Sequence, residues 1–257
     1  KVAHGLSWGE NYGADGVRDG ANIPFSAPGG KPVTFTYDLD SHVLTIEVTD
    51  PPLAGLGQQR AHWVDASTIA WPAALAPSLE GTSWELHHAP GATLEVSEGA
   101  VVGGEATPLE LDPAGLSPAQ LERFPHLAGY LALRLPEGTP RTELEAWLTG
   151  ELLVSQLDPE GAATAITGVQ IPGVLDELFA EAAERELGVS WAKNGKPTVA
   201  LWAPTATKVD LLLWSDGRGS GTPQRLEMTR AADGTWSIAG DKKWKNRAYR
   251  FEVEVYA

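Results

Sequence analysis

The sequence contains no cysteine and is short of positive charge. Without cysteine the chain can form neither a disulfide nor a thiolate metal site, and it has no thiol nucleophile. Its 257 residues carry 34 acidic side chains against 19 basic ones, a formal net charge of −15. This balance disfavours binding to nucleic acid or to an anionic membrane surface, and a neutral partner suits it better. No apolar run is long enough to span a bilayer.

The motifs of common enzymes are also absent. We find no glycine-rich phosphate loop and no Gly-x-Ser-x-Gly elbow. No pair of carboxylates lies in a pattern of alternating strands and helices long enough for a hydrolase barrel. The sequence therefore predicts no catalytic residue and no phosphate-binding cofactor.

Two groups of residues could suggest a metal. His87 and His88 are adjacent on an expected strand, so their side chains point to opposite faces and cannot share an ion; we expect one solvated and one packed imidazole. Asp38, Asp40 and His42 share an expected hairpin turn, where polar residues are common in any case. No metal site is predicted, and calcium at this turn is kept only as an option.

Tryptophan, by contrast, is abundant, with ten residues in a chain that is 42% hydrophobic. Large indole rings are costly to expose, so most should be in cores, and the others are candidate binding platforms. We expect six of them to be buried: Trp63, Trp71, Trp84, Trp147, Trp202 and Trp236.

Hydrophobic periodicity divides the chain into three β-rich units. Residues 1–49 contain two alternating segments, "PVTFTYD" and "HVLTIEV", which predict a hairpin but too few strands to close a sandwich. Pro51-Pro52 marks the first boundary. Residues 50–187 mix strands with helices, one of which begins at a capping box on Ser117. Residues 188–257 contain four short strands typical of a small sandwich.

These patterns predict a mainly β, multi-domain fold, in which immunoglobulin-like β-sandwich modules flank a small α+β domain. In the middle unit, Pro140 should open a second helix. The segment "VLDELFAEAAERELG" should form a third, with one apolar face.

The loop after the first strand gathers aromatic and amide side chains, with Trp8, Asn11, Tyr12 and Asn22 close together in sequence. A sugar ring has an apolar face, on which an indole can stack, and a fringe of hydroxyl groups, which amides can bind. Alternatively, Trp8 fills the edge of the sandwich and the asparagines only shape turns. Spacing alone leaves both interpretations open.

Several longer blocks carry a resemblance to a known family: "FPHLAGYLALRLP", "GVQIPGVLDELFAEAAERELG", "AHWVDASTIAWP" and "TVALWAPTATKVDLLLW". They closely resemble the N-terminal accessory region of pullulanase-type α-1,6-glucosidases, the debranching enzymes of glycoside hydrolase family 13. The middle unit resembles the second N-terminal domain of these enzymes, and the last unit a carbohydrate-binding module of family 48. The first segment resembles the second half of a starch-binding sandwich, whose earlier strands we expect to be missing from this chain.

The resemblance implies particular sugar-binding residues. Related glycogen-binding modules use a Lys, a Trp and a downstream Asn, and the pattern falls here on Lys1, Trp8 and Asn22. The usual second stacking Trp lies in the missing half. In the family 48 unit, the place of a Phe-Asn-x-Trp loop is taken by a loop that begins with Trp214, a second candidate platform. Because Trp214 follows Leu211-Leu212-Leu213, the alternative that it belongs to the core stays open.

The function implied is that of a non-catalytic portion of a debranching enzyme. It would bind α-glucan (starch, pullulan, glycogen or maltooligosaccharides) and support the catalytic domain of the same enzyme, which would hydrolyse α-1,6 bonds outside this chain. A polymeric substrate further implies secretion. Two alternatives stay open: the units are purely structural and bind no sugar, or the middle unit has an unrecognised activity.

Overall fold

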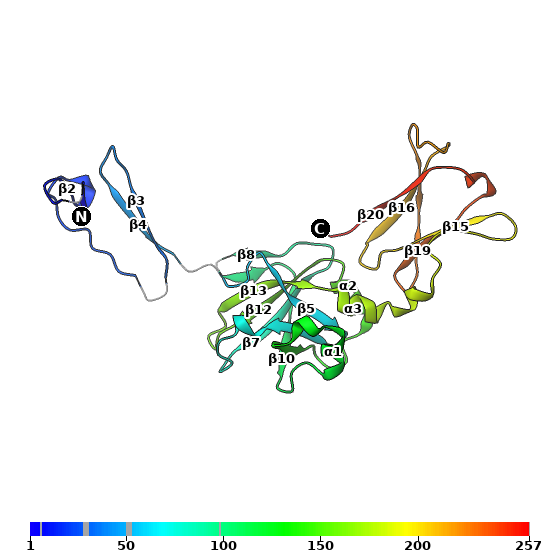
Figure 1. The fold of residues 1–257 in the computed structure, drawn as a ribbon, viewed down its shortest axis with the longest axis horizontal. Coiled ribbons are helices and arrows are strands. Elements are labelled where there is room, and N and C mark those ends of the chain that lie inside the picture. The colour runs from blue at the N-terminus through cyan, green and yellow to red at the C-terminus, as the bar shows by residue number, and fades with distance from the viewer. Residues whose placement is uncertain (6, 28–30, 50–52, 98, 257) are drawn as a thin grey trace. The chain divides into compact units, whose positions relative to one another are not determined.

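The computed structural model describes residues 1–257 apart from 6, 28–30, 50–52, 98 and 257. The chain folds into two compact units, Lys1–Pro52 and Leu53–Ala257 (Figure 1). Strands are the main regular element of both units, which confirms the mainly β fold class. The boundary expected at Pro51-Pro52 lies outside the described residues. No helix in the described part of the chain is long and apolar enough to cross a membrane.

The first unit consists of two small antiparallel ladders. Strand β1 (Val2–Ala3) pairs with β2 (Asn11–Tyr12), and β3 (Val33–Tyr37) pairs with β4 (Leu44–Val48) as the expected hairpin; a short 3₁₀ segment, η1 (Ala14–Gly16), follows β2. Among the described residues of this unit only Asn11 and Gly13 are buried. Two-stranded ribbons cannot cover either of their faces, so the unit has no apolar core of its own.

The second unit begins with a closed barrel of seven strands in the order β10-β11-β6-β5-β13-β12-β7. All neighbours are antiparallel except β13 and β5, which run parallel. A separate small ladder joins β8 (Glu95–Ser97) and β9 (Ala100–Val102). The barrel strands are β5 (Gln59–Asp65), β6 (Thr68–Pro72), β7 (Ser83–Ala89), β10 (Glu105–Asp112), β11 (Tyr130–Arg134), β12 (Glu151–Leu157) and β13 (Ala163–Gln170).

Three short helices accompany the barrel: α1 (Pro118–Arg123), α2 (Arg141–Trp147) and α3 (Pro172–Leu178). The capping box predicted at Ser117 is present, since its hydroxyl accepts from the Gln120 N–H and the Gln120 side chain accepts from the Ser117 N–H. The expected third helix is shorter than its sequence pattern, because the backbone leaves helical geometry at Phe179. The remaining 3₁₀ segments of the barrel region are η2 (Ala73–Leu75), η3 (Pro125–Leu127) and η4 (Ala180–Glu184).

Tryptophan fills the barrel. Trp63, Trp71 and Trp84 are at most 2% exposed and Trp147 is 8% exposed, so the prediction that these four form the core is confirmed. The segment "HWVDASTIAW" forms two strands, because the Asp65 carboxylate accepts the Ser67 N–H and closes a tight turn between them. The expected small α+β domain is thus a closed β-barrel accompanied by short helices.

The histidine pair differs from the prediction. His87 and His88 do point to different surroundings on β7, but both are buried. His87 shares a 2.7 Å hydrogen bond with the Ser155 hydroxyl, and His88 stacks on Trp147 with 4.2 Å between ring centroids. The expectation that one imidazole is solvated was wrong, because both faces of β7 are covered in this barrel.

A sandwich of two sheets follows the barrel, with Val209, Leu211, Met228 and Trp236 in its core. The last strand, β20 (Tyr249–Glu254), is only partly covered, since Tyr249 and Val253 remain 38% and 37% exposed. Among the described strands it pairs only with β16. One sheet has the strand order β14 (Gly188–Trp191), β15 (Pro197–Trp202), β19 (Thr235–Ala239) and β18 (Thr229–Arg230). The other sheet has the order β17 (Gln224–Glu227), β16 (Lys208–Leu213) and β20 (Tyr249–Glu254). The short 3₁₀ segment η5 (Lys242–Trp244) follows β19.

Polar contacts join the barrel to the sandwich within the second unit. Arg230 of β18 lies 3.4 Å from the Glu145 carboxylate of α2 and donates to the Pro204 carbonyl at 3.1 Å. Trp202 packs on the barrel core and donates its indole N–H to the Asp233 carbonyl. Trp202 is only partly buried, so its expected burial is found in part. These contacts fix one domain against the other.

Candidate carbohydrate-binding sites

Trp8 lies on the turn that joins β1 to β2, and 68% of its surface is exposed. The turn is held by a backbone hydrogen bond from His4 to the Glu10 carbonyl and by the Asn11 amide, which donates to the Trp8 carbonyl at 3.1 Å. The alternative in which Trp8 fills a sandwich edge is not what the structure shows. An exposed indole on a braced turn has the geometry of a stacking platform.

Asn11 has a different position from the one expected of a sugar contact. It is 6% exposed, and its amide group also donates to the Asp19 carboxylate at 2.7 Å. Its N–H groups are thus engaged inside the loop. The structure gives Asn11 the role of positioning the Trp8 turn, as the turn-shaping alternative proposed.

Tyr12 is likewise occupied by neighbours. Its ring stacks on His42 with 3.7 Å between centroids, and its hydroxyl donates to Glu10 at 2.7 Å. That hydrogen bond raises the pKa of Tyr12 and is the main cause of a lowered pKa at Glu10. Tyr12 therefore stabilises the loop through one ring face, and that face is closed to a ligand.

Lys1 and Asn22 remain accessible. The Lys1 ammonium group donates to the Asp19 carbonyl at 3.4 Å, and both residues are exposed. The hydrogen bond to Asp19 places the Lys1 amine beside the loop that Asn11 braces. Of the residues predicted for the first unit, Trp8, Lys1 and Asn22 thus have side chains that a ligand can reach.

Trp214 belongs to the second unit, on the loop that follows β16. Its indole N–H donates to the Gly221 carbonyl at 2.9 Å, and the Arg250 guanidinium lies 5.9 Å from a ring centroid. The side chain is partly exposed. The Asp216 carboxylate accepts three backbone N–H groups of this loop, which lowers its pKa and holds the loop in shape. The Trp214 ring is therefore held in place and partly exposed.

Sequence reasoning missed a further exposed indole, Trp191, at the end of β14. It is 48% exposed and lines a cavity of about 80 Å³ with Trp244 and Tyr249. The only signal in the sequence was its place next to the polar turn "KNGK", since a strand-end residue beside such a turn is often exposed.

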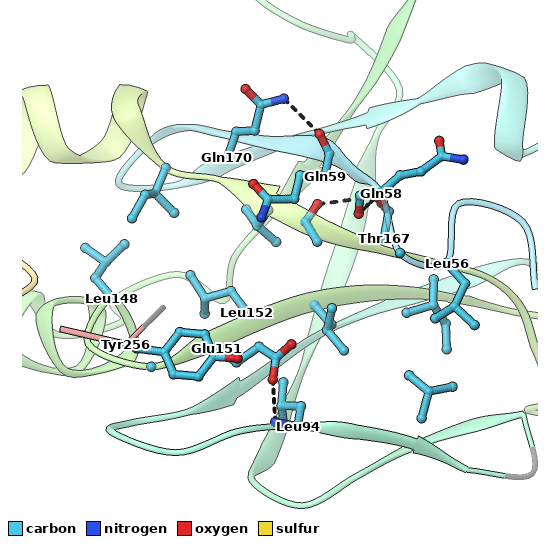
Figure 2. A pocket seen from close by; sticks show the side chains of 18 of the residues that line it. Leu56, Gln58, Gln59, Leu94, Leu148, Glu151, Leu152, Thr167, Gln170 and Tyr256 are labelled. Atoms are coloured by element: carbon cyan, nitrogen blue, oxygen red, sulfur yellow. Dashed lines mark hydrogen bonds between the residues drawn. The ribbon is translucent and has the colours of Figure 1, made fainter.

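A larger cavity of about 720 Å³ lies on the barrel beside β12 and β13 (Figure 2). Its floor is apolar, and Gln170 and Thr167 use their side chains to donate to backbone carbonyls of Gln59 and Gln58. Glu151 accepts the Leu94 N–H at 2.6 Å. Several of its polar side chains are thus bonded to neighbouring residues, and apolar side chains supply much of the remaining lining.

The Tyr256 ring also lines that cavity (Figure 2). Burial, and after it a hydrogen bond to the Glu151 carboxylate, raises the pKa of Tyr256. Tyr256 belongs to the segment after β20, so the end of the sandwich and the wall of the barrel meet at this point.

The geometry gives no support to a metal centre. Within the described ranges, no three His, Asp or Glu side chains are grouped so that they could hold a metal ion. At the hairpin where calcium was kept as an option, the Asp38 carboxylate accepts the N–H groups of Asp40 and Ser41 and the Ser41 hydroxyl. These contacts lower the pKa of Asp38 and show that its carboxylate stabilises the turn.

Comparison with known proteins assigns families to both domains of the second unit. The model of the pullulanase N2 domain matches residues 58–177, and the model of carbohydrate-binding module 48 (isoamylase N-terminal domain) matches residues 186–257. The first match covers the barrel and the second covers the sandwich.

Relatives match most of this chain. A pullulanase of Klebsiella pneumoniae is 33% identical over 210 residues, 79% of this chain and 18% of the relative. The chloroplastic pullulanase 1 of Arabidopsis thaliana is 30% identical over 220 residues, 84% of this chain and 22% of the relative. The chain thus spans about a fifth of the length of these relatives.

Solved structures agree. The Klebsiella pneumoniae pullulanase complexed with maltotriose superposes with a TM-score of 0.69 at 27% identity, over 79% of this chain and 18% of that one. The apo pullulanase of the same organism gives 0.68 at 28% identity, over 79% and 21%. This chain is therefore homologous to the N-terminal region of the pullulanases, with a pullulanase N2 domain followed by a family 48 carbohydrate-binding module.

Proposed function

We propose that this chain is the non-catalytic N-terminal portion of a pullulanase-type debranching enzyme of glycoside hydrolase family 13. It binds α-glucan and supports a catalytic domain that hydrolyses α-1,6-glucosidic bonds with retention, through a pair of carboxylates. The family matches support an accessory role. We also propose that the parent protein acts outside the cell, because its substrate would be a polymer.

The observation that carries the sugar-binding part of the proposal is the exposure of Trp8. An indole that is 68% exposed, on a turn braced by Asn11, presents a flat apolar face at no further conformational cost. Lys1 and Asn22 are accessible for the hydroxyl groups of the same sugar. Trp214 supplies a second, independent surface in the family 48 module.

Each surface should bind weakly. One stacked indole with a few hydrogen bonds, net of desolvation, gives roughly −4 to −5 kcal/mol, which corresponds to sub-millimolar binding at best. Two weak surfaces on one chain are useful on a polymer, because the second contact forms at a high effective concentration. The proposal therefore predicts measurable retention on polymeric glucan and little affinity for short sugars.

Affinity electrophoresis through amylopectin tests this. Trp8→Ala should reduce the retardation of the chain by about threefold or more, since the stacked face is lost. The matched control is Phe25→Ala, which removes another exposed aromatic ring of the same unit, 54% exposed. If Trp8→Ala and Phe25→Ala migrate alike and like the parent chain, the first unit is not a glucan site.

A purely structural role is the second candidate, and the contacts between barrel and sandwich favour it. Arg230 and Glu145 hold the two domains together in a way that glucan binding does not require. Under this alternative, neither Trp8→Ala nor Trp214→Ala changes retardation. The third reading, an activity in the middle unit, is tested by incubating the chain with pullulan; we expect no maltotriose to be released.

A further inference from the structure

Lysine is concentrated at one end of the sandwich. The chain has eight lysines, and five of them belong to two short segments, the turn between β14 and β15 and the stretch that begins with η5: Lys193, Lys196, Lys242, Lys243 and Lys245. Arg247 follows in the second segment. In a chain whose net charge is −15, this basic end is an exception that composition does not explain.

The two segments are neighbours in space. Gly240, which precedes η5, donates its N–H to the Pro197 carbonyl at 2.8 Å. A Cβ placed on Gly195 would lie 3.9 Å from the Lys242 side chain. The β14–β15 turn and η5 therefore form one continuous surface, which we call the basic end.

The basic end is not neutralised from within. Several cations elsewhere in the second unit are paired, among them Lys208 and Arg225 with Asp210, and Arg230 with Glu145. In the part of the chain that the structure describes, no carboxylate lies within ion-pair distance of the five lysines or of Arg247. Asp241, the one acidic residue within the two segments, accepts the backbone N–H of Lys243 as a cap.

An aromatic cavity opens in the same surface. Trp191, Trp244 and Tyr249 line its mouth with Asn246 and Arg247, and its volume is about 80 Å³. The Trp244 ring packs directly against Gly240, where no side chain would fit. Trp191 remains 48% exposed and Tyr249 38% exposed. Aromatic faces, one amide and one guanidinium therefore converge beside unpaired ammonium groups.

We propose that the basic end binds an anionic α-glucan, one that carries phosphate on a glucosyl unit. The exposed rings of Trp191 and Tyr249 stack on the apolar face of that glucose, Asn246 binds a hydroxyl group, and Arg247 with the surrounding lysines binds the phosphate oxygens. This rests on the proposed function and adds to it a preference for a charged form of the polymer. Exposed aromatic rings beside the lysines favour a sugar over an acidic protein surface, because the apolar face of a sugar ring stacks on an aromatic ring.

The test compares one maltooligosaccharide in two forms, carrying a 6-phosphate and after enzymatic removal of it, by isothermal titration on the full chain. At low ionic strength we expect the phosphorylated form to bind about tenfold more tightly, and the preference to disappear near 1 M salt, where the Debye length is about 3 Å. The triple variant Lys242→Gln, Lys243→Gln, Lys245→Gln should lose the preference. Arg218→Gln, an exposed cation on the Trp214 loop, is the control and should keep it.

A second variant, Trp191→Ala, separates stacking from charge. It should weaken binding of the phosphorylated sugar several-fold while leaving the salt dependence in place. Equal affinity for the two forms, or a preference that survives the triple variant, overturns the inference while the proposed function stands. No binding of either form overturns the inference as well, and the proposed function, which predicts retention on polymeric glucan, is then decided by the amylopectin experiment. Equally tight, salt-sensitive binding of polyglutamate would show charge attraction without sugar recognition and would also overturn it.

Discussion

His87 makes the stability of the barrel depend on pH in a way that can be calculated. Burial, and secondarily the neighbouring His88, lowers the pKa of His87 from 6.5 to about 4. The Glu85 carboxylate lies 3.8 Å from the His87 ring and favours the charged form, but it is partly solvated and does not offset the burial. His87 is therefore neutral in the folded barrel at pH 5, where the unfolded chain is largely protonated.

The sign and size follow from linkage. A histidine with a lowered folded pKa costs nothing above pH 6.5, and its cost grows as the pH falls toward 4. From pH 7 to pH 5 the barrel should lose about 2 kcal/mol through His87 alone, and about 3 kcal/mol below pH 4. Burial lowers the pKa of His88 too, which acts in the same direction.

The assay is urea denaturation, followed by tryptophan fluorescence, of the parent chain and of His87→Gln at pH 7 and pH 5. Glutamine cannot take up a proton but can still hydrogen-bond to the Ser155 hydroxyl, 2.7 Å from the imidazole. The loss of stability from pH 7 to pH 5 should be about 2 kcal/mol smaller in the variant, because carboxylate effects cancel in the comparison. Equal losses in the two proteins, or an imidazole that titrates near pH 6.5 by NMR, would refute the reasoning.

Three more predictions concern the barrel and its contact with the sandwich. Trp71→Phe removes the indole N–H that Gln156 accepts at 3.0 Å in the core, and should cost about 1–3 kcal/mol of unfolding free energy, measured in urea. Ser117→Ala breaks the capping box of α1 and should cost about 1 kcal/mol, whereas Ser117→Thr should cost much less. Arg230→Met should lower the free energy of unfolding by about 1 kcal/mol or less and make the segment between barrel and sandwich accessible to limited proteolysis. An unchanged cleavage pattern would show that Arg230 does not fix the two domains against each other.

Local features were predictable from the sequence because local interactions produce them. The capping box at Ser117 needs only four residues, and the tryptophan core follows from the cost of exposing indole rings. Closure of the barrel was not predictable. It depends on parallel pairing between β13 and β5, whose residues are more than a hundred positions apart, and no local pattern specifies such a register.

The candidate sites show the same limit. Trp8 was predicted because its loop gathers aromatic and amide side chains and because the pattern of related modules falls on it, but the engagement of Asn11 with Asp19 depends on how the loop returns on itself. Trp191 was missed because its exposure depends on where β14 ends and on what covers it. One imidazole of the pair His87 and His88 was wrongly expected to be solvated, for the related reason that only a closed barrel covers both faces of a strand.

Exposure is informative in this chain because the other tryptophans are covered. Large aromatic residues contribute most to stability when they are buried, so an exposed aromatic ring is a candidate contact for a ligand. Two of the ten are largely exposed, and eight are buried or partly buried: Trp63, Trp71, Trp84, Trp147, Trp202, Trp214, Trp236 and Trp244. Trp8 lies on the turn between β1 and β2, and Trp191 ends β14 beside a polar turn, so either ring can face a ligand without opening a core. The closed, tryptophan-filled barrel needs neither of them for its stability, so both can be replaced to test sugar binding without unfolding it.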